Sequence, residues 1–403
     1  MPKTVFEPLR LKGASLLPIV QGGMGVGVSG HRLAGTVASL GGLGTISSVD
    51  LRRHHPDLMA KTARSRDRAL IDAANLEALD REVRAARALS AGAGAIAVNV
   101  MRAVSAYADY VRRACESGAQ AVVVGAGLPL DLPELTADHP DVALIPILSD
   151  ARGIALVLKK WMRKQRLPDA IVIENPLYAA GHLGAPTLDS IANPNFAFPE
   201  VIEHTLALFK ELGLERERIP LIVGGGIHTH EQVRELISMG ASAVQLGTPF
   251  AVSEEGDAHP NFKKVLVEAT PDDIVTFMSV AGLPARAVRT PWLADYLQKE
   301  AKLQRVAKPR KCTVGFDCLQ QCGLRDGIAK HGQFCIDTRL AYALAGDVKR
   351  GLFFRGSEAL PFGRQIRPVR DLIDYLLTGK MPARATADES AVGERDMVWL
   401  RST

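Results

Sequence analysis

The stretch from Pro220 to Phe250 constrains the fold more than any other part of the sequence. It reads PLIVGGGIHTHEQVRELISMGASAVQLGTPF. A short apolar run rich in β-branched residues stops at three consecutive glycines, which is typical of a strand that ends in a tight turn. A helical pattern follows, and then a second short apolar run that ends in Gly247 and Thr248. We therefore predict two successive strands, each ending in a glycine turn, with a helix between them.

The boundaries of this helix agree with one another. Thr229 and Gln232 have the spacing of a capping box, in which each side chain binds the backbone of the other residue. Gly240 suits the position just past the carboxyl end, because glycine adopts the left-handed conformation found there. The sequence thus predicts both where the helix begins and where it ends.

The two glycine turns indicate an anion site. Backbone N–H groups at a glycine turn can approach a ligand closely, because glycine has no Cβ atom. Paired turns after strands seven and eight form the recurrent phosphate site of (β/α)8 barrels. A single glycine cluster is equally well read as a tight turn without a ligand. With both turns present, we expect Gly225, Gly226, Gly247 and Thr248 to hold a phosphate group.

Six further apolar runs precede these two strands. Amphipathic segments of helical length, such as 104–117 and 150–164, separate them. Eight strands alternating with helices favour an α/β fold of the (β/α)8 TIM barrel type over a doubly wound sheet. The six runs are Leu17–Gln21, Leu43–Ser47, Ala95–Asn99, Ala121–Gly125, Ala143–Leu148 and Ala170–Glu174.

His182 is the candidate catalytic residue. It lies in the sequence AAGHLGAP after the sixth predicted strand, where small neighbours leave little apolar surface for the imidazole ring to pack against. At a barrel mouth such a ring can bind or move a proton, although a lone loop histidine is often structural. The carboxyl ends of the strands would bring it into one pocket with Met24, Asn99, Gly125 to Pro129, Ser149, Gly225 and Thr248.

The chain is long enough for a large barrel and an appendage. It has 403 residues, of which 47% are hydrophobic. We assign 1–300 to the barrel, with a helical insertion at about 50–92, 301–340 to a segment that holds four cysteines, and 341–403 to a helical tail that packs on the barrel. Within the insertion, His54 and His55 have no ligand partner at metal-binding spacing, so a solvated loop is expected.

Composition excludes several classes of function. The net charge of +5 is too small to indicate nucleic acid binding, and we interpret the basic stretch Lys302–Lys311 as a solvated linker. No secretory signal core and no run of membrane-spanning length occur, so a cytoplasmic protein without a membrane partner is expected. Hydrolase motifs and a dinucleotide-binding fingerprint are also missing. Any NAD(P)H would therefore dock transiently at the barrel mouth.

A set of motifs resembles a known family. They are PIVQGGMG at 18–25, GGLGTIS at 41–47, AVNVM at 97–101, AGH at 180–182, IVGGGI at 222–227, AVQLGTPF at 243–250 and GLPARAVRT at 282–290. In order and spacing they resemble the nitronate monooxygenases, formerly called 2-nitropropane dioxygenases, over roughly three quarters of the chain by motif matching.

The resemblance implies a (β/α)8 barrel that binds FMN non-covalently. Gly22, Gly23 and Met24 would then run along the isoalloxazine ring, and His182 would face the substrate above it. The expected function is the oxidation of alkyl nitronates or related small substrates by an FMN-dependent oxidoreductase. The remaining residues that would bind the cofactor are Asn99, Gly125, Ser149, Gly181, Gly225, Gly226, Gly247 and Thr248.

Two features depart from this family or resemble its relatives. Where members usually have Glu-Ala-Gly-Gly-His, this chain has Tyr178-Ala-Ala-Gly-His182, so the acidic residue is absent. The segment Gly125–Pro129 is similar to a loop of the FMN-type enoyl-(acyl carrier protein) reductases. An enoyl-thioester or quinone reductase is therefore the alternative. A phosphate-binding barrel without redox chemistry is the alternative from another class. A homodimer is compatible with the sequence, which does not decide the oligomeric state.

Four of the five cysteines crowd into one short segment. Cys312, Cys318, Cys322 and Cys335 have the spacing C-x5-C-x3-C-x12-C and could supply four thiolates to a [4Fe–4S] cluster or to zinc. The last three resemble the cluster segment of the 2,4-dienoyl-CoA reductase family, although the first gap is longer here. Zinc is less favoured because no C-x2-C pair is present, and reduced core thiols are the third alternative. A cluster would imply a ferredoxin-like electron donor or NAD(P)H, and Cys115 is expected in the core.

Overall fold

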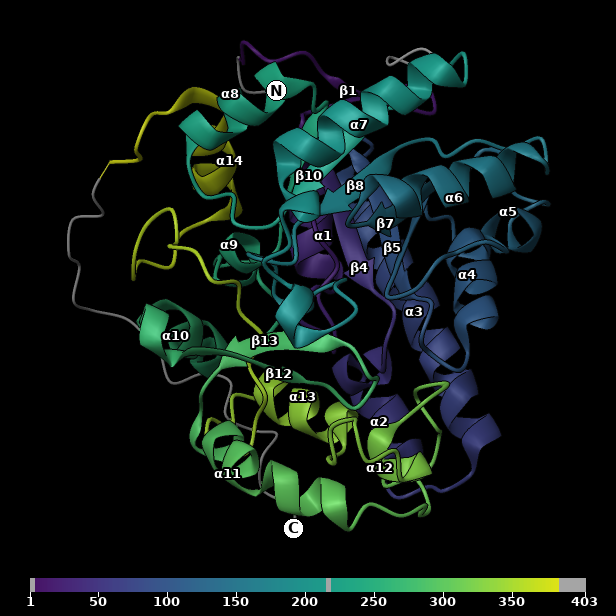
Figure 1. Ribbon diagram of the computed structural model, residues 1–403, viewed down its shortest axis with the longest axis vertical. Coiled ribbons are helices and arrows are strands. Elements are labelled where there is room, and N and C mark those ends of the chain that lie inside the picture. The colour runs from purple at the N-terminus through teal and green to yellow at the C-terminus, as the bar shows by residue number, and fades with distance from the viewer. Residues whose placement is uncertain (1–3, 215–218, 384–403) are drawn as a thin grey trace.

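The computed structural model describes residues 4–214 and 219–383. Eight parallel strands form a closed barrel, as the sequence predicted, and each strand pairs with the one before and after it (Figure 1). The sequence-based boundaries are right to within two residues. The barrel strands are β3 (Ile19–Gln21), β4 (Leu43–Ser47), β5 (Ala95–Met101), β6 (Ala121–Gly125), β7 (Ala143–Leu148), β8 (Ile171–Glu174), β10 (Leu221–Gly224) and β11 (Ala243–Leu246).

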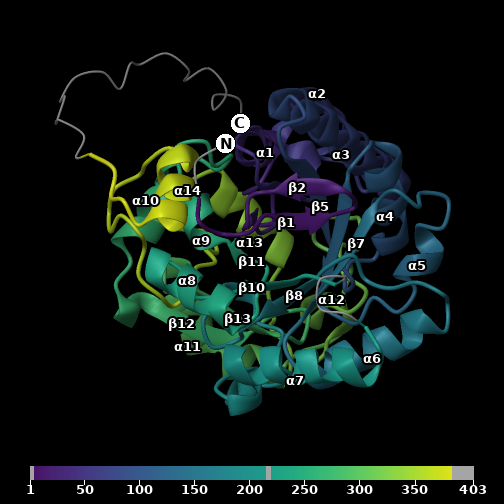
Figure 2. The ribbon, with the colours of Figure 1, turned by 90° about the horizontal axis from the view of Figure 1, so that it is seen from above.

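Helices surround the strands when the barrel is viewed from above (Figure 2). Between β10 and β11 lies α8, and its ends match the prediction. Thr229 and Gln232 form the capping box, and Gly240 is left-handed with φ of 119°. The helices between the barrel strands are α1 (His31–Ser39), α2 (Pro56–Thr62), α3 (Arg68–Ser90), α4 (Tyr107–Glu116), α5 (Leu132–Leu135), α6 (Ala151–Met162), α7 (Phe198–Glu211) and α8 (His230–Met239).

The barrel interior is filled by small and branched side chains. Val172 of β8 and Ile222 of β10 belong to this interior cluster, whereas Ile171 and Ile173 pack outward against the helices. Successive residues of a strand point to opposite sides, so Glu174 follows Val172 on the inside. The same alternation places Asn99 and Ile147 at the inner rim of the mouth. These rim positions form the floor of the site.

A hairpin closes the opposite end of the barrel. Its strands are β1 (Leu9–Leu11) and β2 (Ala14–Leu16), which pair in antiparallel register. Leu9, Leu11 and Leu16 are buried in the same cluster as the interior side chains. The sequence analysis did not identify this hairpin, because its strands have three residues each and carry no long periodic pattern.

A three-stranded antiparallel sheet lies beside the mouth. It consists of β9 (Gly181–His182), β13 (Pro284–Val288) and β12 (Ile274–Met278). His182 pairs with Ala285 of the central strand. The sequence analysis placed His182 on a loop after the sixth strand, whereas the structure holds it in a short strand. Its backbone is therefore fixed by a sheet that lies outside the barrel.

The insertion contains a 3-10 turn (Leu51–His54) and the two helices α2 and α3. The expectation that its paired histidines lie in a solvated loop is wrong. The Nε2 atom of His54 lies 2.8 Å from the carbonyl oxygen of Gly27. The Nε2 atom of His55 lies 3.1 Å from a carboxylate oxygen of Glu82. His54 therefore ties the insertion to the loop after β3, and His55 ties the start of the insertion to its own helix α3.

The remaining helices lie at two places on the barrel (Figure 1). Helices α11, α12 and α13 group together near β12 and β13, whereas α14 packs against α8 and α1. Residues 384–403 of the predicted helical tail lie outside the described residues. No helix in the described part is long and apolar enough to cross a membrane. The helices that follow the last barrel strand are α9 (Thr248–Ala251), α10 (Pro260–Glu268), α11 (Pro291–Arg305), α12 (Gly323–Asp326), α13 (Ile336–Leu344) and α14 (Val369–Thr378).

Candidate active site

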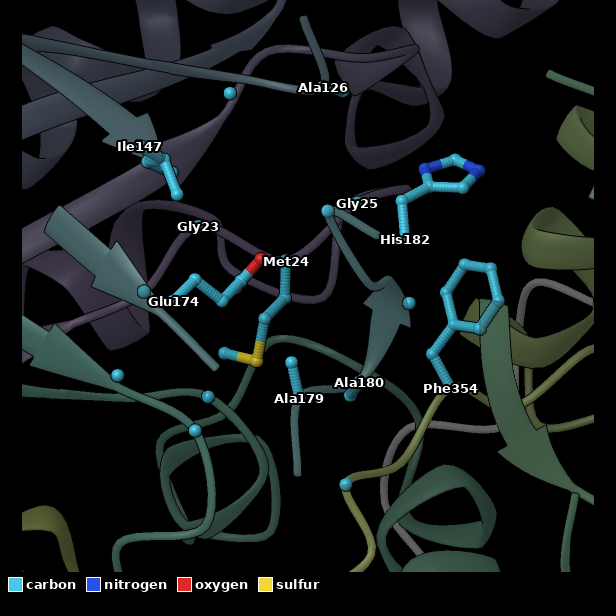
Figure 3. A pocket seen from close by; sticks show the side chains of 18 of the residues that line it. Gly23, Met24, Gly25, Ala126, Ile147, Glu174, Ala179, Ala180, His182 and Phe354 are labelled. Atoms are coloured by element: carbon cyan, nitrogen blue, oxygen red, sulfur yellow. The ribbon is translucent and has the colours of Figure 1, made fainter. Parts of the chain in front are cut away.

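A cavity of about 550 Å³ opens at the carboxyl ends of the barrel strands. This volume lies within the range of small-molecule and cofactor sites. Every residue predicted to bind the cofactor or to catalyse lines this cavity, and Figure 3 shows several of them around it. These residues are Gly22, Gly23, Met24, Asn99, Gly125, Ser149, Gly181, His182, Gly225, Gly226, Gly247 and Thr248.

The turn after β10 requires glycine. Gly225 and Gly226 have φ angles of 112° and 78°, which side chains rarely allow. A Cβ atom at Gly226 would also lie 2.8 Å from the Cβ atom of Tyr178. The turn is therefore pressed against the loop that follows β8, and it presents backbone to the cavity.

The backbone amides of the two turns are available to a ligand. Within the described residues, the N–H groups of Gly225, Gly226 and Gly247 donate no hydrogen bond to another backbone group. A Cβ atom at Gly247 would meet only the side chain of Met24, at 3.7 Å, so this residue faces the cavity. Unpaired amides on two adjacent strand ends can bind an oxyanion such as a phosphate.

The loop after β3 forms a second wall of the cavity. The Gly22 N–H donates to the carbonyl oxygen of Leu246 at 2.9 Å, which extends the strand into the mouth. A Cβ atom at Gly23 would lie 2.3 Å from the Cβ atom of Asn99. Only glycine therefore lets this loop pass over the Asn99 side chain. The result is a backbone surface next to Met24 on which a flat ring could lie.

His182 projects into the cavity from β9 (Figure 3). Its Nε2 atom lies 3.0 Å from the hydroxyl oxygen of Ser279, and its ring centre lies 6.0 Å from that of Phe354. Burial lowers the pKa of His182 to about 4. The imidazole is therefore neutral near pH 7, and in this form it can accept a proton or share a hydrogen bond.

Glu174 is a functional candidate that the sequence analysis missed. It is the last residue of β8, and its carboxyl group points into the cavity beside Met24 (Figure 3). Burial alone raises the pKa of Glu174 to about 7. The signal was available in the sequence, because in IVIE the second and fourth residues share one side of the strand. An acidic residue at the inner end of a barrel strand points to the site.

The segment that follows the cysteines also lines the cavity, which could not be seen in the sequence. Phe354 forms an isolated β-bridge with Ala287 of β13 and lies next to the His182 ring. The Gly356 N–H donates to the Thr248 hydroxyl at 3.1 Å. This contact joins residues 108 positions apart. No local pattern marks such a contact, because it depends on how the segment folds back over the mouth.

Known proteins share the barrel that surrounds this site. A model of the nitronate monooxygenase family matches residues 10–379, which is most of the chain. The chain belongs to the nitronate monooxygenase family. The resemblance seen in the sequence motifs is thus confirmed over a longer range than those motifs covered.

Individual relatives match over shorter stretches. A probable nitronate monooxygenase of Bacillus subtilis is 31% identical over 84 residues, which are 21% of this chain and 24% of that protein. A putative nitronate monooxygenase of Saccharomyces cerevisiae is 28% identical over 163 residues, or 38% of this chain and 40% of that protein. The chain therefore aligns with about a quarter to two fifths of these curated relatives.

Solved structures share the fold at low identity. FabK from Thermotoga maritima superposes with a TM-score of 0.59 at 23% identity, covering 89% of this chain and 91% of that one. A nitroalkane oxidase from Streptomyces ansochromogenes gives a TM-score of 0.58 at 18% identity, covering 89% and 94%. Both support the barrel fold of the nitronate monooxygenase family.

The four cysteines lie within the range matched by the nitronate monooxygenase family, next to the cavity. Cys318 lines the cavity, and its carbonyl oxygen accepts a hydrogen bond of 3.2 Å from the Ser105 N–H. Burial raises the pKa of the Cys318 thiol well above its usual range, and the three other cysteines add to this effect. Of the four cysteines, Cys318 is the one that lines the cavity in the described part of the chain, and the charges of the other three act on its thiol.

Hydrogen-bond donors face two of these sulfur atoms. The Thr338 hydroxyl donates to the Cys335 sulfur at 3.2 Å, and the Arg325 N–H donates to the Cys322 sulfur at 3.5 Å. In the described part of the chain, no three His, Cys, Asp or Glu side chains are placed to hold one metal ion. The tetrahedral arrangement that zinc needs is thus not formed here. Cys115, by contrast, is buried in the main core, as predicted.

Proposed function

We propose that this protein is an FMN-dependent oxidoreductase that oxidises alkyl nitronates or related small substrates. The observation that carries the proposal is the convergence on one cavity of three unpaired glycine amides and a neutral, half-buried histidine. The family match supports the same chemistry. Because individual relatives align over limited stretches, the activity itself is the point to be tested.

The residues of the cavity fit FMN. The unpaired amides of Gly225, Gly226 and Gly247 would hold the phosphate, as in other barrels that bind it after strands seven and eight. The backbone next to Met24 and the side chain of Asn99 would lie along the isoalloxazine ring. When bound, FMN accepts electrons from the substrate, and the protein supplies binding and orientation.

His182 would act on the substrate rather than on the cofactor. Its neutral imidazole can accept a proton from the substrate or share a hydrogen bond with the nitro group. Ser279 fixes the ring by its hydrogen bond to Nε2, and Phe354 covers one side of the ring. These contacts hold the reacting group and keep water from that side of the cavity.

The proposed activity is tested by the FMN content of the protein and by its oxygen uptake with a candidate substrate. We expect the purified protein to contain FMN or to take it up, and to consume oxygen when propionate 3-nitronate or a nitroalkane is added. Reduction of an enoyl thioester without oxygen uptake would instead favour the reductase alternative, in line with the resemblance of Gly125–Pro129 to a loop of the enoyl reductases. A colourless protein that ignores FMN would leave a phosphate-binding barrel without redox chemistry.

We further propose that Cys312, Cys318, Cys322 and Cys335 hold a [4Fe–4S] cluster. Two observations support it, namely the influence of the three other cysteines on the pKa of Cys318 and the donors that face two of the sulfur atoms. In such a cluster each thiolate binds a different iron, so the sulfur atoms need not surround one metal ion. The cluster would exchange single electrons with a ferredoxin-like protein or serve NAD(P)H-dependent reduction.

A further inference from the structure

Glu174 occupies a special position in the floor of the cavity. It is paired in register with Gly224, the residue just before the glycine turn proposed to bind phosphate. Its backbone is held there, because the N–H of the next residue donates to the Gly224 carbonyl oxygen at 2.9 Å. The residue therefore lies next to the strand that leads into the phosphate turn, and its carboxyl group points towards Met24 (Figure 3).

The carboxyl group of Glu174 differs from the other three that line the cavity. Asp150 accepts a hydrogen bond from the Gly153 N–H, Asp337 accepts one from Arg53, and Glu358 one from the Ser357 hydroxyl. In the described part of the chain, burial is the one influence on the pKa of Glu174, and neither a hydrogen bond nor an ion pair holds its carboxylate. The Glu174 side chain is half-buried in the cavity, so a ligand that covered this floor would displace its water and would have to supply a hydrogen-bond partner in its place.

The surroundings favour the protonated form once a ligand covers this floor. Within the described residues, no lysine or arginine lines the cavity. A bound FMN would remove the remaining water and bring its phosphate to the neighbouring turn. Both desolvation and a nearby negative charge disfavour a carboxylate. A neutral carboxyl group, by contrast, is a hydrogen-bond donor.

We propose that Glu174 is protonated when FMN is bound and donates a hydrogen bond to the flavin, so that FMN binding takes up a proton above neutral pH. This inference rests on the proposed FMN site. The acceptor is an oxygen or nitrogen atom of the ring or a hydroxyl oxygen of the ribityl chain. The proton comes from solution and converts the carboxylate of the free protein into the carboxyl group of the complex.

The sign of the pH dependence follows from the free protein. Below about pH 7 the carboxyl group is already protonated, so Glu174 adds no pH dependence to the FMN affinity there. Above this pH a proton must be taken up, and the affinity falls by about tenfold per pH unit. The phosphate of FMN ionises near pH 6 and does not contribute in this range, since its second pKa is about 6.

The experiment measures proton uptake directly on the unaltered protein. FMN is titrated into apoprotein at about pH 8 by calorimetry in two buffers that differ in ionisation enthalpy, and the difference gives the protons bound. We expect about one proton per FMN, as the linkage relation requires. FMN binding without proton uptake would overturn the inference alone, whereas no FMN binding at any pH would overturn the proposed FMN site as well.

Two variants identify the group that takes up the proton. Glu174→Gln keeps a hydrogen-bond donor but cannot titrate, so we expect FMN affinity that is constant with pH and proton uptake near zero. Glu358→Gln changes another carboxyl group of the same cavity and should keep the slope of the parent protein. If Glu174→Gln kept the slope, or Glu358→Gln lost it, the assignment to Glu174 would be wrong. Thermal melts of both variants show that they are folded.

Discussion

The Nε2 atom of His182 lies 3.0 Å from the hydroxyl oxygen of Ser279, a residue 97 positions later in the chain. The Ser279 oxygen also accepts a hydrogen bond of 3.2 Å from the Ala281 N–H. The second lone pair of this oxygen can accept from a proton on His182 Nε2, which would leave Nδ1 as the nitrogen that can accept a proton from the cavity. Two segments of one antiparallel sheet therefore set the orientation of the ring.

Replacement of His182 tests its role in turnover. We expect His182→Ala to lower kcat/KM for a nitronate by about a hundredfold or more, the usual contribution of a general acid or base. The FMN content should not change, because the ring faces the substrate. Ser279→Ala removes one hydrogen bond and should cost about five- to tenfold. Full turnover in His182→Ala would exclude a catalytic role.

The titration of His182 gives a second prediction. Burial lowers the pKa of this imidazole to about 4, so it stays neutral until the pH falls well below 6. NMR spectra of protein labelled in the histidine rings should show one ring with a midpoint near 4. That signal should be absent from His182→Ala. A midpoint at the ordinary value of about 6.5 would mean that the ring is hydrated and that the cavity is more open than described.

Gly226→Ala should weaken FMN binding by at least about tenfold. A left-handed conformation costs a residue with a side chain roughly 1–2 kcal/mol, and the added Cβ atom would also press against Tyr178. The matched control is Gly213→Ala, at which φ is 68° and no atom of the described residues lies within 4 Å of the new Cβ atom. Fluorescence titration with FMN separates the two, since only Gly226→Ala should change the dissociation constant.

Cys318→Ala tests the proposed cluster. We expect the iron and sulfide content of anaerobically purified protein to fall to a small fraction of the parent value, because a four-thiolate site loses one ligand. Cys115→Ala is the control, since this buried thiol belongs to α4 and is not one of the four proposed ligands. Equal iron content in Cys318→Ala and the parent protein would contradict the assignment. A parent protein without iron would remove the cluster altogether.

The barrel and most of its site were predictable because the signals were local. Each strand is a short apolar run followed by glycine or a polar residue, and parallel strands bring their carboxyl ends together wherever the helices lie. This is why Asn99 and Gly225, separated by half of the barrel, were placed in one cavity. The capping box at Thr229 likewise needs only neighbouring residues.

Residues that depend on distant contacts were missed for the opposite reason. Phe354 reaches the cavity through a bridge to Ala287, and nothing in the sequence near Phe354 indicates that partner. The histidines of the insertion were interpreted as solvated because Glu82, which binds His55, lies 27 positions further along a helix. Glu174 is different, since its alternation with Val172 is visible in the sequence and by itself places the carboxyl group inside the barrel mouth.

Glu82 provides the last prediction, which concerns stability. Its Oε2 atom accepts a hydrogen bond from the His31 backbone N–H at 2.7 Å and lies 2.9 Å from the Nδ1 atom of the same residue. Its Oε1 atom lies 3.1 Å from the Nε2 atom of His55. Although burial opposes it, hydrogen bonds from these two histidines hold the pKa of Glu82 far below its usual range. The hydrogen bond to Glu82 in turn raises the pKa of His31. This cluster joins α1 to α3 beneath the loop that passes Met24.

Glu82→Gln should therefore lower the free energy of unfolding by about 3 kcal/mol, the typical cost of removing one partner of a buried charge pair. The depressed pKa of Glu82 stabilises the fold above about pH 4.3 and is lost as the pH falls towards the folded value. The raised pKa of His31 stabilises below about pH 6.5 and is lost as the pH rises through the folded value. The difference in the free energy of unfolding between parent and variant should thus be largest between these limits in urea melts.

Glu77→Gln, on the exposed side of α3, should leave the free energy of unfolding nearly unchanged. A difference between the parent protein and Glu82→Gln that did not vary with pH would mean that Glu82 stabilises the fold by packing rather than by charge.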